Sequence, residues 1–164
     1  MKTLYLVRHA KSSWKQPELS DFERPLNKRG KNNAPFMGKL LSDKGVNPEL
    51  VISSPAKRAS VTAKIIASEI NYPEEKIVFD ENIYEATGRN LLEIISGTEE
   101  KYNSVMLFGH NPGLTVLQNN LSDHFIDNIP TCGVVALEFK TFWKEIELNS
   151  AGFIFFEYPK KHKL

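Results

Sequence analysis

The chain has 164 residues, of which 41% are hydrophobic and 25% charged, a composition that suits one globular domain spanning residues 1–164 around a substantial core. Twenty-one basic residues against twenty acidic ones leave a formal net charge of +1, which argues against a nucleic-acid-binding domain because such domains are strongly basic. Any recognition of phosphate is therefore expected to depend on a few local side chains.

Two features of the sequence indicate a cytoplasmic protein that neither spans a membrane nor is exported. Cys132 is the single cysteine, so an intrachain disulfide and a thiolate cluster for zinc are both excluded. The apolar run between Lys2 and Arg8 extends only from Leu4 to Val7, which is too short for a signal-peptide core or a membrane span. A monomer is expected by default.

Short apolar runs rich in branched and aromatic residues alternate with stretches of helical spacing. The lengths of the runs are typical of β-strands, which we expect at residues 4–7, 50–52, 77–79, 105–108, 134–139 and 153–156. Helical spacing of apolar residues occurs over 59–70 and 91–95. This alternation favours a three-layer α/β/α sandwich with a mostly parallel central sheet, in which the last two strands close one edge.

Three helix starts are marked by capping side chains. Ser54-Pro55 and Asn111-Pro112 each place a capping residue before a proline, which is favoured at the first position of a helix. Asn27 can open another helix. Pro35 would interrupt that helix at a cost of about 3 kcal/mol, so a kink or a later start is expected there.

Polar side chains follow three of the predicted strands at the points where the strands end. Arg8-His9 follows the first strand, Arg58 follows the turn after the second, and His110 follows the strand at 105–108. In open α/β sheets the ligand crevice lies beyond the carboxyl ends of the strands. We therefore expect these side chains to converge on one pocket. Taken alone, His9 could equally be structural, and a single histidine at the position of His110 is more often structural.

Lys57 and Arg58 fall in the first turn of a predicted helix, where the partial positive charge of the helix end disfavours cations. An anion bound at that end would remove the conflict, because free backbone amides and an arginine fork together form a phosphate cradle. The alternative is that both long side chains simply reach water.

Two glycines, Gly109 and Gly113, flank the segment of His110. They would allow a ligand to approach the backbone closely there.

These segments resemble motifs of the histidine phosphatase superfamily, also described as phosphoglycerate mutase-like. The dipeptide Arg8-His9 looks like the hallmark that follows the first strand of that family. Further similar segments are residues 24–30, residues 53–59 with Thr62, and residues 109–111. Within the superfamily, the short chain and the segments 8–12 and 109–112 are most similar to the SixA-type phosphohistidine phosphatases.

The resemblance implies that His9 is a nucleophile that accepts the phosphoryl group, while Arg8, Arg58 and His110 hold the phosphoryl oxygens. Positioning and electrostatic stabilisation dominate such a transfer. No metal or other cofactor is expected if two arginines and a protonated histidine supply the positive charge, and the sequence has no His-Glu-x-x-His pattern. A hydrogen bond should fix the tautomer of His9, but its partner is not identifiable from the sequence.

Other residues are candidates for supporting roles. Members of the family commonly carry an acid that protonates the leaving oxygen, and Glu85 is the candidate here; an ordinary exposed loop glutamate is the alternative. Arg24, with Lys28-Arg29, could line the rim and bind an acidic phosphoprotein, or these residues could be a solvated charge run. Trp14 could cover the pocket or only pack beside it. Residues 160–163 are expected to form a solvated tail.

The leading function is removal of phosphate from phosphohistidine on a signalling protein, in an open pocket without a lid. A phosphatase for small phosphate esters is the enzymatic alternative, and it would need an acid such as Glu85. A mutase is disfavoured because it requires a closed site that excludes water. An inactive phosphoprotein-binding module would lack the nucleophile, which His9 supplies. The expected partner is thus a phosphohistidine-bearing protein or a small phosphorylated substrate, not a nucleic acid or a membrane.

Overall fold

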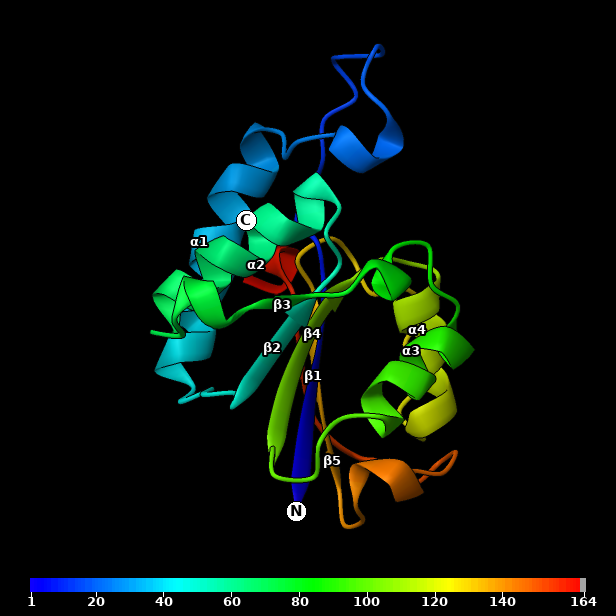
Figure 1. Cartoon of the computed structure of the whole chain (residues 1–164). Helices are drawn as coiled ribbons and strands as arrows, with labels where there is room; N and C mark the ends of the chain where they lie inside the picture. The colour runs from blue at the N-terminus through cyan, green and yellow to red at the C-terminus, as the bar shows by residue number, and fades with distance from the viewer. Residues whose placement is uncertain (163–164) are drawn as a thin grey trace.

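The computed structural model describes residues 1–162, which fold into three layers with a sheet between two pairs of helices (Figure 1). The described residues form a six-stranded sheet in the order β3-β2-β4-β1-β5-β6. Its strands are β1 (Lys2–Arg8), β2 (Leu50–Ser53), β3 (Val78–Phe79), β4 (Ser104–Gly109), β5 (Val134–Phe139) and β6 (Gly152–Glu157). The predicted α/β/α class is confirmed.

Most of the sheet is parallel, and this determines where the strand ends meet. Strand β4 pairs in parallel with both β1 and β2, and β2 pairs in parallel with β3. Strand β5 runs antiparallel to β1 and to β6, so the last two strands close one edge as expected. The carboxyl ends of β1, β2 and β4 therefore lie side by side at one end of the sheet.

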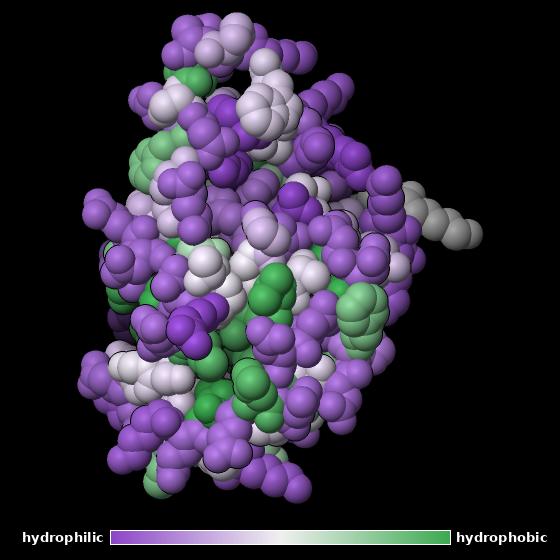
Figure 2. Space-filling model, turned by 90° about the vertical axis from the view of Figure 1, so that its right-hand side faces the viewer, coloured by the Kyte–Doolittle hydropathy of each residue, from purple (hydrophilic) through white to green (hydrophobic). Residues whose placement is uncertain are grey.

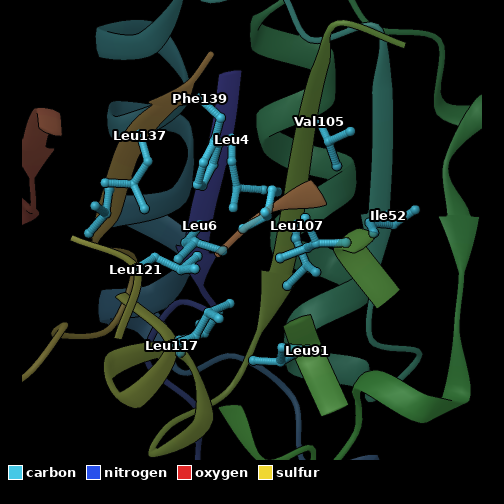
Figure 3. Packing of buried hydrophobic residues seen from close by; sticks show 14 of the residues in the cluster. Leu4, Leu6, Ile52, Leu91, Val105, Leu107, Leu117, Leu121, Leu137 and Phe139 are labelled. Atoms are coloured by element: carbon cyan, nitrogen blue, oxygen red, sulfur yellow. The ribbon is translucent and has the colours of Figure 1, made fainter. Parts of the chain in front are cut away.

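Two pairs of helices cover the two faces of the sheet (Figure 1). Helices α1 (Lys28–Asp43) and α2 (Lys57–Glu69) pack together on one face, and α3 (Gly88–Ser96) and α4 (Gly113–Leu121) on the other. Successive side chains of a strand point to opposite faces, so the apolar runs of β1 and β4 contribute to two separate cores. Figure 3 shows the core beneath α3 and α4, where Leu6 and Leu107 of the sheet lie near Leu117.

The helix starts differ in part from the sequence predictions. Asn27 caps α1 as expected, since its side chain accepts a hydrogen bond from Gly30 N. The later start expected from Pro35 is wrong, because α1 runs through this residue; the buried face of the helix against α2 stabilises it despite the missing backbone donor.

The predicted cap at Ser54 is also wrong. Helix α2 begins at Lys57, two residues after Pro55, and its N-cap position is Ala56. The Ser54 hydroxyl instead accepts a hydrogen bond from Ala56 N at 3.2 Å and contacts His110. The start of α4 is closer to the prediction. The helix begins at Gly113, but the side chain of Asn111 still accepts a hydrogen bond from a backbone amide of its first turn, Thr115 N.

The surface is mostly hydrophilic, with hydrophobic residues gathered in the lower middle of the face drawn in Figure 2. No helix among residues 1–162 is both long and apolar enough to span a bilayer.

The expected solvated tail is exposed but held in place, because Lys161 and His162 both pair with the Glu157 carboxylate, at 3.3 and 3.0 Å. Lys163 lies outside the described residues.

Candidate active site

A cleft of about 300 Å³ opens beyond the carboxyl ends of β1, β2 and β4. The structure brings five predicted site residues together in its wall, so the expected convergence of the strand ends is observed. Side chains from distant segments line it: Arg8, His9, Lys11, Ser12, Trp14, Arg24, Arg58, His110, Asn111 and Thr131. Four of these side chains are arginine or lysine and none is a carboxylate, which favours an anionic ligand.

His9 is held at the end of β1 by its own backbone and by its neighbour. Its backbone N–H donates a hydrogen bond to Gly109 O at 3.2 Å, and its ring Nδ1 lies 2.7 Å from the carbonyl oxygen of Ala10. Because a carbonyl oxygen can only accept, Nδ1 carries the proton and Nε2 is left with a free lone pair. Burial, together with nearby positive charge such as that of Arg58, lowers the pKa of His9 to about 3, so the ring is neutral at neutral pH.

His110 packs against His9, with 5.2 Å between the ring centroids. Its Nε2 lies 2.8 Å from the Ser54 hydroxyl, and its buried Nδ1 has no hydrogen-bond partner within residues 1–162. Burial, followed by the charge of Arg58, lowers the pKa of His110 to about 4. The ring of His110 is therefore neutral at neutral pH, and its protonation during phosphoryl transfer stays a prediction.

Asp21 contacts two arginines of the cleft, an arrangement that the sequence did not reveal. Its backbone oxygen accepts from Arg58 Nη1 at 2.7 Å, and its carboxylate accepts from Arg58 Nη2 at 3.0 Å and from Arg24 Nη1 at 2.8 Å. The Tyr84 hydroxyl donates to the same carboxylate at 2.6 Å. This hydrogen bond from Tyr84, with those from the arginines, lowers the pKa of Asp21 to about 2 and raises that of Tyr84 to about 12.

Arg24 is fixed from several sides at the rim of the cleft. Its Nε donates to Ser13 O at 3.1 Å, and its Nη2 contacts the Ser12 hydroxyl. The guanidinium carbon lies 3.3 Å from the centroid of the Trp14 ring, which is 73% exposed. Trp14 thus lines the rim and stacks on Arg24 in a cation–π contact.

Arg8 connects the cleft to the loop before β5. Its Nη1 donates to Ile129 O at 3.0 Å, and the same carbonyl accepts from Asn111 Nδ2 at 2.8 Å. Its Nε is buried without a hydrogen-bond partner among the described residues. Burial, and then the charge of Arg58, lowers the pKa of Arg8 from its ordinary value. An anion in the cleft would relieve both the unpaired donor and the repulsion between the two arginines.

Glu85 is not brought together with the other candidates. Its side chain is exposed, its backbone adopts a left-handed conformation with φ of 58°, and it is absent from the lining of the cleft. The preceding residue, Tyr84, reaches the site instead, with its ring 5.6 Å from that of His110.

Within residues 1–162 no three or more His, Cys, Asp or Glu side chains are grouped as metal ligands.

Comparison with known proteins identifies the family. The model of the histidine phosphatase superfamily (branch 1) matches residues 4–104. An uncharacterized chloroplastic protein of Arabidopsis thaliana is 32% identical over 153 residues, which cover 88% of this chain and 70% of the relative. The chain belongs to the histidine phosphatase superfamily, and it is accordingly a phosphohydrolase.

Two solved structures are similar over nearly the whole chain. The putative phosphohistidine phosphatase SixA from Agrobacterium tumefaciens is 30% identical, with a TM-score of 0.82 over 96% of this chain and 98% of that chain. The protein histidine phosphatase SixA in complex with tungstate has a TM-score of 0.84 at 20% identity, over 98% and 99% of the two chains. The resemblance to the SixA type is thereby confirmed.

Proposed function

We propose that this protein removes the phosphoryl group from phosphohistidine on a protein, with His9 as a transiently phosphorylated nucleophile. The observation that carries this proposal is the hydrogen bond from His9 Nδ1 to the Ala10 carbonyl oxygen. It leaves Nε2 unprotonated, and the pKa of about 3 keeps it so at neutral pH. The likeness to the SixA structures, one of which binds the tetrahedral oxyanion tungstate, supports the same assignment.

In the first step Nε2 of His9 attacks phosphorus in line, and the bond from phosphorus to the substrate nitrogen breaks with its electron pair moving to that nitrogen. Arg8 and Arg58 stabilise the charge on the equatorial oxygens, while Arg24 binds the substrate at the rim of the cleft. A bound phosphoryl group favours the protonated form of His110, which then acts as a third cation. In the second step water attacks phosphorus, the electron pair returns to Nε2, and inorganic phosphate leaves.

The leaving group favours phosphohistidine over a phosphate ester as substrate. A phosphorylated imidazole retains one basic ring nitrogen that takes a proton from solvent, so its departure requires no acid from the enzyme. An alkoxide leaving group requires an acid in the cleft, and Glu85 is not among the lining residues. The alternative of a phosphatase for small esters therefore lacks the acid that the sequence suggested for it, Glu85.

The decisive experiment compares phosphate release by the wild type and a His9→Ala variant, with chelator present, from a phosphohistidine peptide and from an aryl phosphate. We expect rapid release from the peptide by the wild type and none by the variant. A Lys31→Ala variant, which removes an exposed side chain of α1 outside the cleft, serves as the control and should stay active.

Each other outcome has a definite meaning. Faster release from the aryl phosphate would reassign the enzyme to small esters. Activity that survives in His9→Ala would overturn the nucleophile, and inactivity of the wild type on both substrates would indicate a phosphoprotein-binding module.

A further inference from the structure

A second recess adjoins the candidate active site and shares part of its wall. Its volume is about 230 Å³, and Arg8, Lys11 and Thr131 line both hollows. The rest of this second hollow, termed here the basic recess, is formed by Arg29, Asn128, Pro130, Tyr158, Pro159 and Lys160. A substrate with its phosphoryl group on His9 therefore has the basic recess directly beside it.

Within the described residues, the basic recess is lined by cations and by no carboxylate. Arg8, Lys11, Arg29 and Lys160 contribute four positive charges, and no carboxylate belongs to the lining. Lys11, Arg29 and Lys160 are exposed, and none of the three forms an ion pair within residues 1–162. Since the whole chain carries a net charge of only +1, this positive potential is a local feature that attracts anions.

Backbone contacts hold Lys11 and Arg29 on the same side of the recess. Asn27 N donates to the Lys11 carbonyl oxygen at 3.0 Å. The first turn of α1 packs against that carbonyl at Gly30, where a Cβ atom would collide with the oxygen. The absence of a side chain at Gly30 thus allows Arg29 to stand beside Lys11.

Lys160 is positioned independently from the C-terminal turn η5 (Pro159–His162). Lys161 N donates to Tyr158 O at 3.1 Å, and Lys161 Nζ donates to Phe156 O at 3.0 Å. The ion pair of Lys161 and the hydrogen bond of His162 with the Glu157 carboxylate tie the same turn to the end of β6. The charge of Lys160 therefore belongs to an ordered wall and not to a loose tail.

A third recess continues the surface beyond the basic one. It has a volume of about 380 Å³ and shares Asn128, Pro130 and Tyr158 with the basic recess. Phe125, which is 72% exposed, and Asp127 also line it. A small phosphate ester would occupy only the cleft around His9, whereas a series of three connected recesses suits a macromolecular substrate.

We propose that the basic recess binds an acidic side chain of the protein substrate that neighbours the phosphohistidine, with an apolar side chain of the same protein against Phe125. This inference rests on the proposed phosphohistidine phosphatase activity and names its partner class, an acidic phosphoprotein. Complementary charges at such a rim act on association and its salt dependence. Arg29 and Lys160, which line the basic recess but not the cleft around His9, therefore contribute to KM and leave the chemical step unchanged.

The test uses two phosphohistidine peptides of equal length, one with glutamate and one with glutamine at the flanking positions. The wild type should cleave the glutamate peptide with a kcat/KM about fivefold higher at low ionic strength, through KM. This preference should vanish at high salt, because exposed charges are screened. Arg29→Glu should abolish the preference while cleavage of the glutamine peptide and of an aryl phosphate persists.

Lys31→Glu is the matched control, because Lys31 is exposed on the same helix and does not line the recess. It should retain the preference. Equal kcat/KM for both peptides with the wild type, or a preference that survives in Arg29→Glu, would overturn the proposal.

Failure of the proposed function has a different signature, namely hydrolysis of the aryl phosphate but of neither peptide. Anisotropy of the two fluorescently labelled phosphopeptides with His9→Ala then tests the recess by itself. Tighter binding of the glutamate peptide supports the acidic-partner proposal, and equal binding overturns it.

Discussion

The Asp21 carboxylate lies 3.0 Å from Nη2 of Arg58, the arginine proposed to hold the transferred phosphoryl group. With a pKa of about 2, Asp21 is ionised at neutral pH and stands where it competes with an incoming anion for the guanidinium. The carboxylate is half-exposed, so its effect is screened by solvent. We therefore expect Asp21 and a bound phosphate to compete for Arg58.

Replacing Asp21 by asparagine should strengthen the binding of inorganic phosphate. Removal of one negative charge beside Arg58 is expected to lower the inhibition constant of phosphate about threefold, a modest change because the pair is partly exposed. Competition assays against an aryl phosphate measure it. Glu23→Gln removes an exposed charge from the same short helix without touching either arginine and should change nothing. Weaker inhibition in Asp21→Asn would show that the carboxylate mainly positions Arg58.

Glu85→Gln should leave catalysis nearly unchanged. Its side chain is exposed and lies outside the cleft lining, so kcat and KM for a phosphohistidine peptide should stay within about twofold of the wild type, because the substitution keeps the fold and removes no group from the cleft. Steady-state kinetics on the peptide and on an aryl phosphate provide the measurement. A loss of activity confined to the aryl phosphate would restore Glu85 as the acid for esters.

His9 and His110 should make stability fall at acid pH. Their folded pKa values of about 3 and about 4 are below the ordinary 6.5, so the unfolded chain binds more protons as pH drops below 6.5. The stability linked to these groups is complete above that pH. It is lost as the pH falls towards about 4 for His110 and about 3 for His9, at no more than about 1.4 kcal/mol per proton and pH unit.

Urea denaturation at about pH 7.5 and about pH 5 measures this loss. A variant with both His9→Asn and His110→Asn should lose less stability between the two conditions than the wild type does. Equal losses would contradict the lowered pKa values.

The sequence predicted the sheet and most of the cleft because both depend on local patterns. Strands β1 and β4 are buried on both faces and read as continuous apolar runs, and parallel pairing brings Arg8 opposite Gly109, next to His110. No local sequence pattern marks Asp21 as part of the site. Its partners Arg58 and Tyr84 are 37 and 63 residues away, so its role depends on how the loop before α1 folds over α2.

The orientation of His9 was equally inaccessible from the sequence, since a backbone carbonyl of any residue type can accept its proton. Ser54 was interpreted as a helix cap, but the tertiary contact with His110 determines where its hydroxyl points. Local capping preferences are weak compared with such contacts.

Gly30→Ala should destabilise the protein although alanine favours helices by about 1 kcal/mol over glycine. The added Cβ meets the Lys11 carbonyl oxygen, a backbone atom that also accepts from Asn27 N and cannot turn aside as a side chain would. Overpacking of this kind costs about 1–3 kcal/mol, so a net loss of about 1 kcal/mol in the free energy of unfolding is expected. Urea denaturation measures it, with Lys31→Ala, one residue along the same helix and exposed, as the neutral control. The collision can be relieved only if α1 moves away from the Lys11 segment, so the variant should also lose part of its preference for the glutamate peptide. Unchanged stability in Gly30→Ala would contradict the close contact between α1 and Lys11.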